Sequence, residues 1–159
     1  MQRVFILAVL GGLTVCCGGK IQERKNGFEV SRPKREDKKE VTTVEVPVDL
    51  ANIGIGPIKE MTFPDEIDEE MVFRGEEKFN TICVSCHMID QRMIGPPMKG
   101  IFERRNPAWV MNILLDPDAM LRDDPITKAL LKEYNNAIMP NQNLSVEEAR
   151  DILEYLRAL

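Results

Sequence analysis

Histidine is almost absent from this chain of 159 residues, since His87 is the only one. A single imidazole excludes every centre that needs two histidine ligands. Cysteine is also scarce: there are four, and Cys16 and Cys17 lie near the start, far from Cys83 and Cys86. A structural zinc ion takes four ligands, so a C-x-x-C pair should be repeated elsewhere in the chain. Because it is not repeated, we expect no zinc centre.

Strands, long apolar runs and catalytic groupings are missing as well. No segment alternates apolar and polar residues for long enough to predict a sheet. The apolar run over residues 4–15 is shorter than the roughly 20 residues that cross a bilayer. The neighbouring carboxylates Glu76 and Glu77, and also Asp123 and Asp124, are expected to be solvated helix faces or caps. These absences leave an all-α protein without the residues of a hydrolase or a transferase.

The segment FNTICVSCHM, residues 79–88, contains Cys83, Cys86 and His87 in the pattern C-x-x-C-H. A thioredoxin-like cysteine pair would need a βαβ context, which the sequence does not offer. Covalent haem attachment needs no further partner, because thiols at i and i+3 reach the two vinyl groups and the next residue places its imidazole under the iron. The pattern therefore predicts one haem c, attached through Cys83 and Cys86, with His87 as an axial ligand.

The N-terminal residues predict export. Residues 1–17 combine Arg3 with a short apolar run, as in a secretory signal peptide. Export agrees with haem attachment, which takes place outside the cytoplasm. Cys16 or Cys17, at the end of the run, resembles the lipidation site of a bacterial lipoprotein. We expect a periplasmic protein that is anchored to a membrane through a lipid on one of these cysteines.

The remaining sequence divides into a tether and one domain. Residues 18–60 mix both charge signs with few aromatic side chains and are expected to form a charged, flexible tether. The last part of this tether, IGIGPIKEM, is more apolar and is a candidate for contact with the domain. Residues 61–159 have the size of one domain. Helix signals in this domain are the apolar face leading into Cys83 and the starts at Asn106–Pro107, Asp124–Pro125 and Ser145–Glu148.

Three segments of the domain resemble class I c-type cytochromes, the monohaem family that includes mitochondrial cytochrome c. Gly75 and Phe79 precede the C-x-x-C-H pattern at that family's spacing, and GPPMKGIFERR resembles its central loop. Ile152, Tyr155 and Leu156 match its last helix. The resemblance implies a cytochrome c fold, in which about four to five helices surround one covalently attached haem.

The resemblance also implies which residues line the haem pocket. They are Gly95, Pro96, Met98, Arg104 and Trp109. The carbonyl of Pro96 would accept the second N–H of His87, Met98 would pack on the porphyrin, and Arg104 would lie near a propionate. The alternatives are an ordinary turn at Pro96 and a solvated pair of Arg104 and Arg105. Trp109 would either donate its indole N–H to a propionate or belong to the core.

The sixth ligand of the iron has to come from a methionine, or the position is open, because no second histidine exists. Met139 lies in the polar segment NNAIMPNQN before the last helix, and the following Pro140 resembles the family's Met-Pro element. Met120, in DPDAM, and an open sixth position remain as alternatives, whereas Met111 is expected to fill the core. Met139 is the predicted ligand.

Methionine ligation predicts electron transfer and no enzymatic activity. A soft thioether favours Fe(II), and an iron with six ligands is poor at binding oxygen or peroxide. We therefore expect a one-electron carrier of a bacterial respiratory chain. Residues 61–159 carry 18 acidic and 11 basic residues, which argues against nucleic acid and for a basic or apolar face on a redox partner.

The partners we expect are an electron donor complex and a terminal oxidase or nitrous oxide reductase-like acceptor. This expectation comes from the layout, which resembles anchored cytochromes of Bacteroidota-type bacteria. Two other functions remain open: a gas sensor or peroxidase with a labile sixth ligand, and a fixed cytochrome subunit of a larger respiratory complex.

Overall fold

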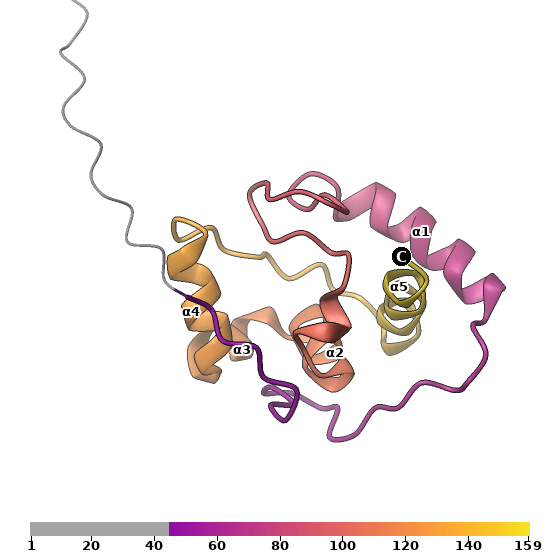
Figure 1. Ribbon diagram of the computed structural model, residues 1–159, viewed down its shortest axis with the longest axis horizontal. Coiled ribbons are helices and arrows are strands. Elements are labelled where there is room, and N and C mark those ends of the chain that lie inside the picture. Colours follow the sequence, from indigo (N-terminus) through magenta and orange to yellow (C-terminus); the bar gives the residue numbers. More distant parts are fainter. Residues whose placement is uncertain (1–44) are drawn as a thin grey trace, which may run out of the picture. The chain divides into compact units, whose positions relative to one another are not determined.

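The computed structural model describes residues 45–159 (Figure 1). Within this range the chain forms five α-helices and one short 3-10 helix. Their bounds are α1 Glu69–Ile82, η1 Ile101–Glu103, α2 Pro107–Leu115, α3 Pro117–Asp123, α4 Pro125–Glu133 and α5 Val146–Arg157. The only β-type pairing among these residues is a single bridge between Asp49 and Arg105. The prediction of an all-α fold is confirmed.

Helices α2, α3 and α4 each begin with a polar residue followed by proline. The caps Asn106, Asp116 and Asp124 accept hydrogen bonds from the backbone N–H groups of Ala108, Ala119 and Thr127. Proline suits the first helical position because an N–H there would have no partner within the helix. This pattern predicted α2 and α4, but α3 was missed although Asp116 and Pro117 carry the same signal. The capping box predicted for α5 is present at Ser145 and Glu148.

Helices α1 and α5 share the most extensive contact of any two helices in the described range. Gly75 lies at their crossing, where an added Cβ atom would lie 2.1 Å from the carbonyl oxygen of Asp151. Only glycine permits two backbones to approach so closely. Phe79 and Ile152 are almost completely buried beside this crossing. The packing of α1 on α5 therefore fixes the position of Cys83, which ends α1.

Residues 46–58 form an N-terminal strap that lies against α2 and α3 (Figure 1). The buried side chain of Asn112 accepts a hydrogen bond from the N–H of Ile58 at 3.0 Å and donates to the carbonyls of Ile53 and Ile58 at 2.9 Å. A Cβ atom on Gly56 would lie 2.3 Å from the amide oxygen of Asn112. The strap is part of the domain, so the boundary predicted after residue 60 is corrected.

The predicted signal peptide, its candidate cysteines Cys16 and Cys17, and the tether up to residue 44 lie outside the described residues. No helix within residues 45–159 is long and apolar enough to cross a membrane.

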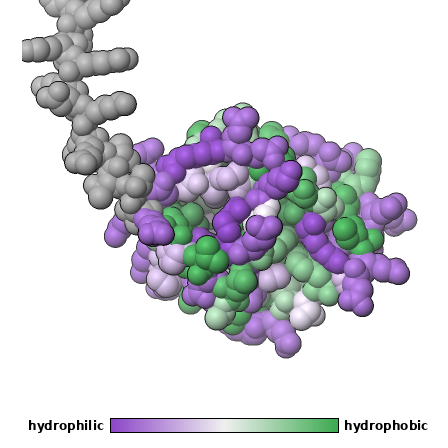
Figure 2. Space-filling model, in the orientation of Figure 1, coloured by the Kyte–Doolittle hydropathy of each residue, from purple (hydrophilic) through white to green (hydrophobic). Residues whose placement is uncertain are grey.

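Figure 2 shows one face of the domain, on which apolar and polar residues are interspersed. Scattered apolar residues such as the exposed Phe73 are ordinary on a protein surface.

Candidate haem site

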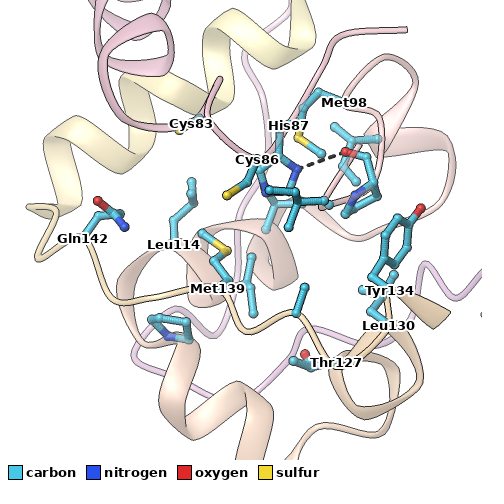
Figure 3. Close-up of a pocket in the computed structure, with 18 of the residues that line it drawn as sticks. Cys83, Cys86, His87, Met98, Leu114, Thr127, Leu130, Tyr134, Met139 and Gln142 are labelled. Atoms are coloured by element: carbon cyan, nitrogen blue, oxygen red, sulfur yellow. Dashed lines mark hydrogen bonds between the residues drawn. The ribbon is translucent and has the colours of Figure 1, made fainter. Parts of the chain in front are cut away.

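The C-x-x-C-H segment forms a tight turn at the C-terminal end of α1. Cys83 is the C-terminal cap of α1, and its N–H donates to the carbonyl of Phe79. The N–H groups of Cys86 and His87 both donate to the carbonyl of Cys83, at 3.0 and 2.9 Å. All three residues of the pattern line one cavity (Figure 3). Both cysteines are free thiols, as attachment of a porphyrin requires.

The electrostatics of Cys83 favour the protonated thiol. Burial, with a smaller contribution from Cys86, raises the pKa of Cys83 to about 11. Redox and metal-binding cysteines act as thiolates, and a raised pKa disfavours that form. Thioether formation, in contrast, adds S–H across a vinyl double bond. Within residues 45–159 no three side chains of His, Cys, Asp or Glu are grouped as a metal site.

The ring of His87 is held by the loop that follows it. Its Nδ1 lies 3.0 Å from the carbonyl oxygen of Pro96, so Nδ1–H donates and Nε2 is left as the ligand atom. Burial lowers the pKa of His87, against the opposing effect of the Pro96 carbonyl, and the lowered pKa keeps the ring neutral at pH 7. A Cβ atom on Gly95 would lie 2.4 Å from the ring carbon Cε1. Glycine is therefore needed for the loop to pass beside the imidazole.

The cavity in front of His87 has a volume of about 210 Å³. Helices α2, α3, α4 and α5 and the segment before α5 contribute to its other walls. Its apolar lining from the helices includes Val110, Ile113, Leu114, Leu130, Leu131, Ile152 and Leu156. Such a lining suits the apolar faces of a porphyrin and excludes water from them.

Met139 lies across the cavity from His87, on the segment between α4 and α5 (Figure 3). Met98 is the other methionine of the described range that lines the cavity, and it belongs to the loop on the His87 side. Met120 is fully buried elsewhere, and its sulfur accepts a hydrogen bond from the N–H of Ile55 in the strap at 3.0 Å. Met111 is also buried in the core and does not line the cavity. The alternative of Met120 as a ligand is therefore not supported.

Arg104 and Arg105 differ in their surroundings, although both line the cavity. The guanidinium of Arg104 donates to the carbonyls of Pro97, Lys99 and Gly100 and thereby closes the loop. Arg105 is only 4% exposed and donates to the carbonyl of Pro47 in the strap at 2.8 Å. The alternative of a solvated arginine pair is wrong for Arg105, because the strap covers its side chain.

Of the two roles expected for Trp109, a donor to a propionate or a core residue, the structure shows the second. The indole is 4% exposed, and its N–H donates to a carboxylate oxygen of Asp124 at 3.1 Å. The indole N–H therefore has a partner within the protein and is not free for a propionate. Asp124 itself was expected to be solvated or a cap: it caps α4, yet it is 1% exposed. Its burial depends on the strap and on α2, which are distant in sequence.

The residues of the cavity fit a covalently bound haem. Two thiols stand at one edge, a neutral imidazole faces the interior from the same segment, and a thioether lies opposite. The glycine that clears space for the imidazole and the apolar walls agree with the same group. Cys83 and Cys86 would hold the porphyrin, and His87 would bind its iron.

Comparisons with known proteins agree with this site. The family model for cytochrome c matches residues 72–159. A cytochrome c from Rhodothermus marinus is 42% identical, with a TM-score of 0.62, over 65% of this chain and 88% of that one. An engineered cytochrome c from the same organism, Rma TDE, bound to a carbene intermediate, is also 42% identical over 65% of this chain and 88% of that one, with a TM-score of 0.60. The comparison with curated proteins gave no match.

The family model covers more than half of the chain and includes the C-x-x-C-H turn, the loop that orients His87 and the crossing of α1 with α5. The chain therefore belongs to the cytochrome c family, as a class I c-type cytochrome with a covalently bound haem c and the electron-carrier function of that family.

Proposed function

We propose that this cytochrome is a one-electron carrier of a bacterial respiratory chain in which His87 and Met139 are the two axial ligands of the haem iron. When bound, the haem supplies the exchange of one electron between Fe(II) and Fe(III). The observation that carries the proposal is the location of Met139 across the cavity from His87. No other methionine of the described range lines that side of the cavity.

The protein residues have distinct tasks in this function. Pro96 accepts the Nδ1–H of His87, which fixes the plane of the ring and makes its Nε2 a stronger donor to iron. The thioether of Met139 is a soft ligand that favours Fe(II), and methionine ligation raises the reduction potential. The apolar walls keep water from both positions. A site that changes little between the two oxidation states is suited to fast electron transfer.

The ligand assignment is tested on the wild-type holoprotein. Because both axial positions are filled by protein groups, we expect a weak sulfur-to-iron charge-transfer band in the oxidised state and no rapid binding of CO by the reduced state at neutral pH. Absorption spectra with and without CO measure both. Rapid CO binding together with a missing band would favour a gas sensor or a peroxidase in place of the carrier.

The partner and the location are further parts of the proposal. We propose that the protein is exported to the periplasm, is anchored through a lipid on Cys16 or Cys17, and passes electrons from a donor complex to a terminal oxidase or reductase. The excess of acidic residues in the domain supports a partner with a basic or apolar face, and interfaces for transient electron transfer are small. Fatty-acid labelling that is lost in Cys16→Ser or Cys17→Ser is expected, and an unlabelled mature protein would contradict the anchor.

A further inference from the structure

The cavity wall formed by α2 and α4 is held from behind by the buried carboxylate of Asp124. One oxygen accepts hydrogen bonds from the indole N–H of Trp109 at 3.1 Å and from the N–H and hydroxyl of Thr127 at 2.7 and 2.9 Å. The other oxygen accepts from the side-chain amide of Asn52 at 2.7 Å. Trp109 and Thr127 line the cavity, whereas Asn52 belongs to the strap. One carboxylate therefore joins the strap, α2 and α4.

Capping of α4 does not account for this arrangement. Asp116 caps α3 by accepting a hydrogen bond from the N–H of Ala119, and its side chain remains partly exposed. Asp124 makes the same kind of cap but is 1% exposed and accepts three further hydrogen bonds. Burying an anionic carboxylate is costly unless charges or donors compensate for it. A cap alone does not require that cost.

The charge of Asp124 lies behind the cavity wall, in contact with Trp109 and Thr127, which line the cavity. Its oxygens accept four hydrogen bonds, which is the pattern of a carboxylate. Arg105, which also lines the cavity, lies over the ring of Trp109 with its guanidinium carbon 5.5 Å from the ring centroid. Burial and Arg104 lower the pKa of Arg105, and Asp124 opposes that shift. Charges act more strongly in such surroundings than in water, because the dielectric constant is low.

We propose that Asp124 is a positioning residue of the haem site and also adjusts the haem electrostatically. Its hydrogen bonds hold Trp109 and Thr127 in the cavity wall, and its negative charge favours Fe(III) and so lowers the reduction potential. Asn52 moderates that charge by donating a hydrogen bond to it, which gives the strap a part in setting the potential. The inference rests on the haem of the family and does not depend on which residue is the sixth ligand.

Reduction potentials of three holoprotein variants test the inference. Asp124→Asn removes the charge and keeps the shape, so at a fixed potential near the midpoint the ratio of reduced to oxidised protein should rise by about tenfold, or about 59 mV for one electron. Asn52→Leu removes a donor and leaves the carboxylate, so the ratio should fall by about two- to threefold. Asp118→Asn changes an exposed carboxylate in α3 and should leave the ratio within about 1.5-fold of wild type.

The ratio is expected to rise in Asp124→Asn and to fall in Asn52→Leu. These opposite changes distinguish electrostatic control of the potential from a merely structural role. A structural role would loosen the cavity wall in both variants and admit water, so the ratio would fall in both, and that result would overturn the proposal. An Asp124→Asn protein that matches Asp118→Asn would overturn it too. If Asp124→Asn does not fold, Thr127→Val must lower the ratio as Asn52→Leu does, with Thr127→Ser restoring it, while the absorption spectra of both variants stay those of wild type. An unchanged ratio, or a spectrum altered by the entry of water, contradicts the proposal.

Discussion

The two sides of the haem site are built in different ways. The near side, residues 83–96, is one continuous segment that supplies both thiols, the imidazole and the carbonyl that orients it. The far side is assembled from α2, α4, the segment that carries Met139, and the strap, which holds it from behind. A near side made of local contacts can be read from a short motif. A far side made of contacts between distant segments depends on the whole fold.

Because the two sides are built differently, changes on the near side should abolish or distort haem binding. Changes on the far side should alter the properties of a haem that stays attached. The largest effect is expected from the double variant Cys83→Ala with Cys86→Ala. It should lose all covalent haem, because no other cysteine within residues 45–159 lines the cavity. Haem staining of denaturing gels measures this. Full staining of the double variant would contradict covalent attachment through these thiols.

Gly95→Ala should distort the near side without breaking the attachment. Its new methyl group would meet the His87 ring at 2.4 Å, so the ring or the loop has to move, which should destabilise the protein by roughly 1–3 kcal/mol. The absorption bands of the haem should shift as well, because this imidazole is the proposed ligand of the iron. Denaturant unfolding and absorption spectra provide the two measurements.

Gly100→Ala is the matched control for this variant. Gly100 lies in the same loop at a φ of +65°, so alanine there is strained, but its neighbours are the side chains of Glu103 and Arg104. It should lose stability and keep the spectrum of wild type. If Gly95→Ala also keeps that spectrum, close contact with His87 is not what requires glycine at position 95.

The sequence predicted the near side because its signals are local. The C-x-x-C-H pattern, the glycine at position 95 and the proline that follows stand within fourteen residues, and the structure brings them together as one unit. It gave residues 53–61 as a candidate for contact with the domain, but it did not predict the contacts of residues 46–52 or the burial of Asp124, because the partners of Asn52 and Arg105 are 72 and 58 residues away. Helix α3 was not predicted, although Asp116 followed by Pro117 is as local a signal as the starts of α2 and α4.

A smaller effect is expected where the two sides are joined. Arg92, in the near-side loop, forms an ion pair with Glu133 at the end of α4. Its guanidinium carbon lies 4.0 Å from the centroid of the Tyr134 ring. Because Arg92 is partly exposed, Arg92→Leu should cost only about 1 kcal/mol of stability. Thermal unfolding of the holoprotein checks this, with Arg122→Leu, whose partner Asp123 is its neighbour in α3, as the control. Equal losses in both variants would show that the contact does not join the two sides.

The assignment of Met139 on the far side is tested most directly by the reduction potential and the charge-transfer band of the Met139→Ala protein. Loss of the thioether should remove the band and lower the potential by about 100–300 mV, within the range that axial ligands control. Met120→Leu, which changes a buried methionine away from the cavity, should keep both. A Met139→Ala protein with an unchanged band and potential would contradict the assignment of Met139 as the sixth ligand.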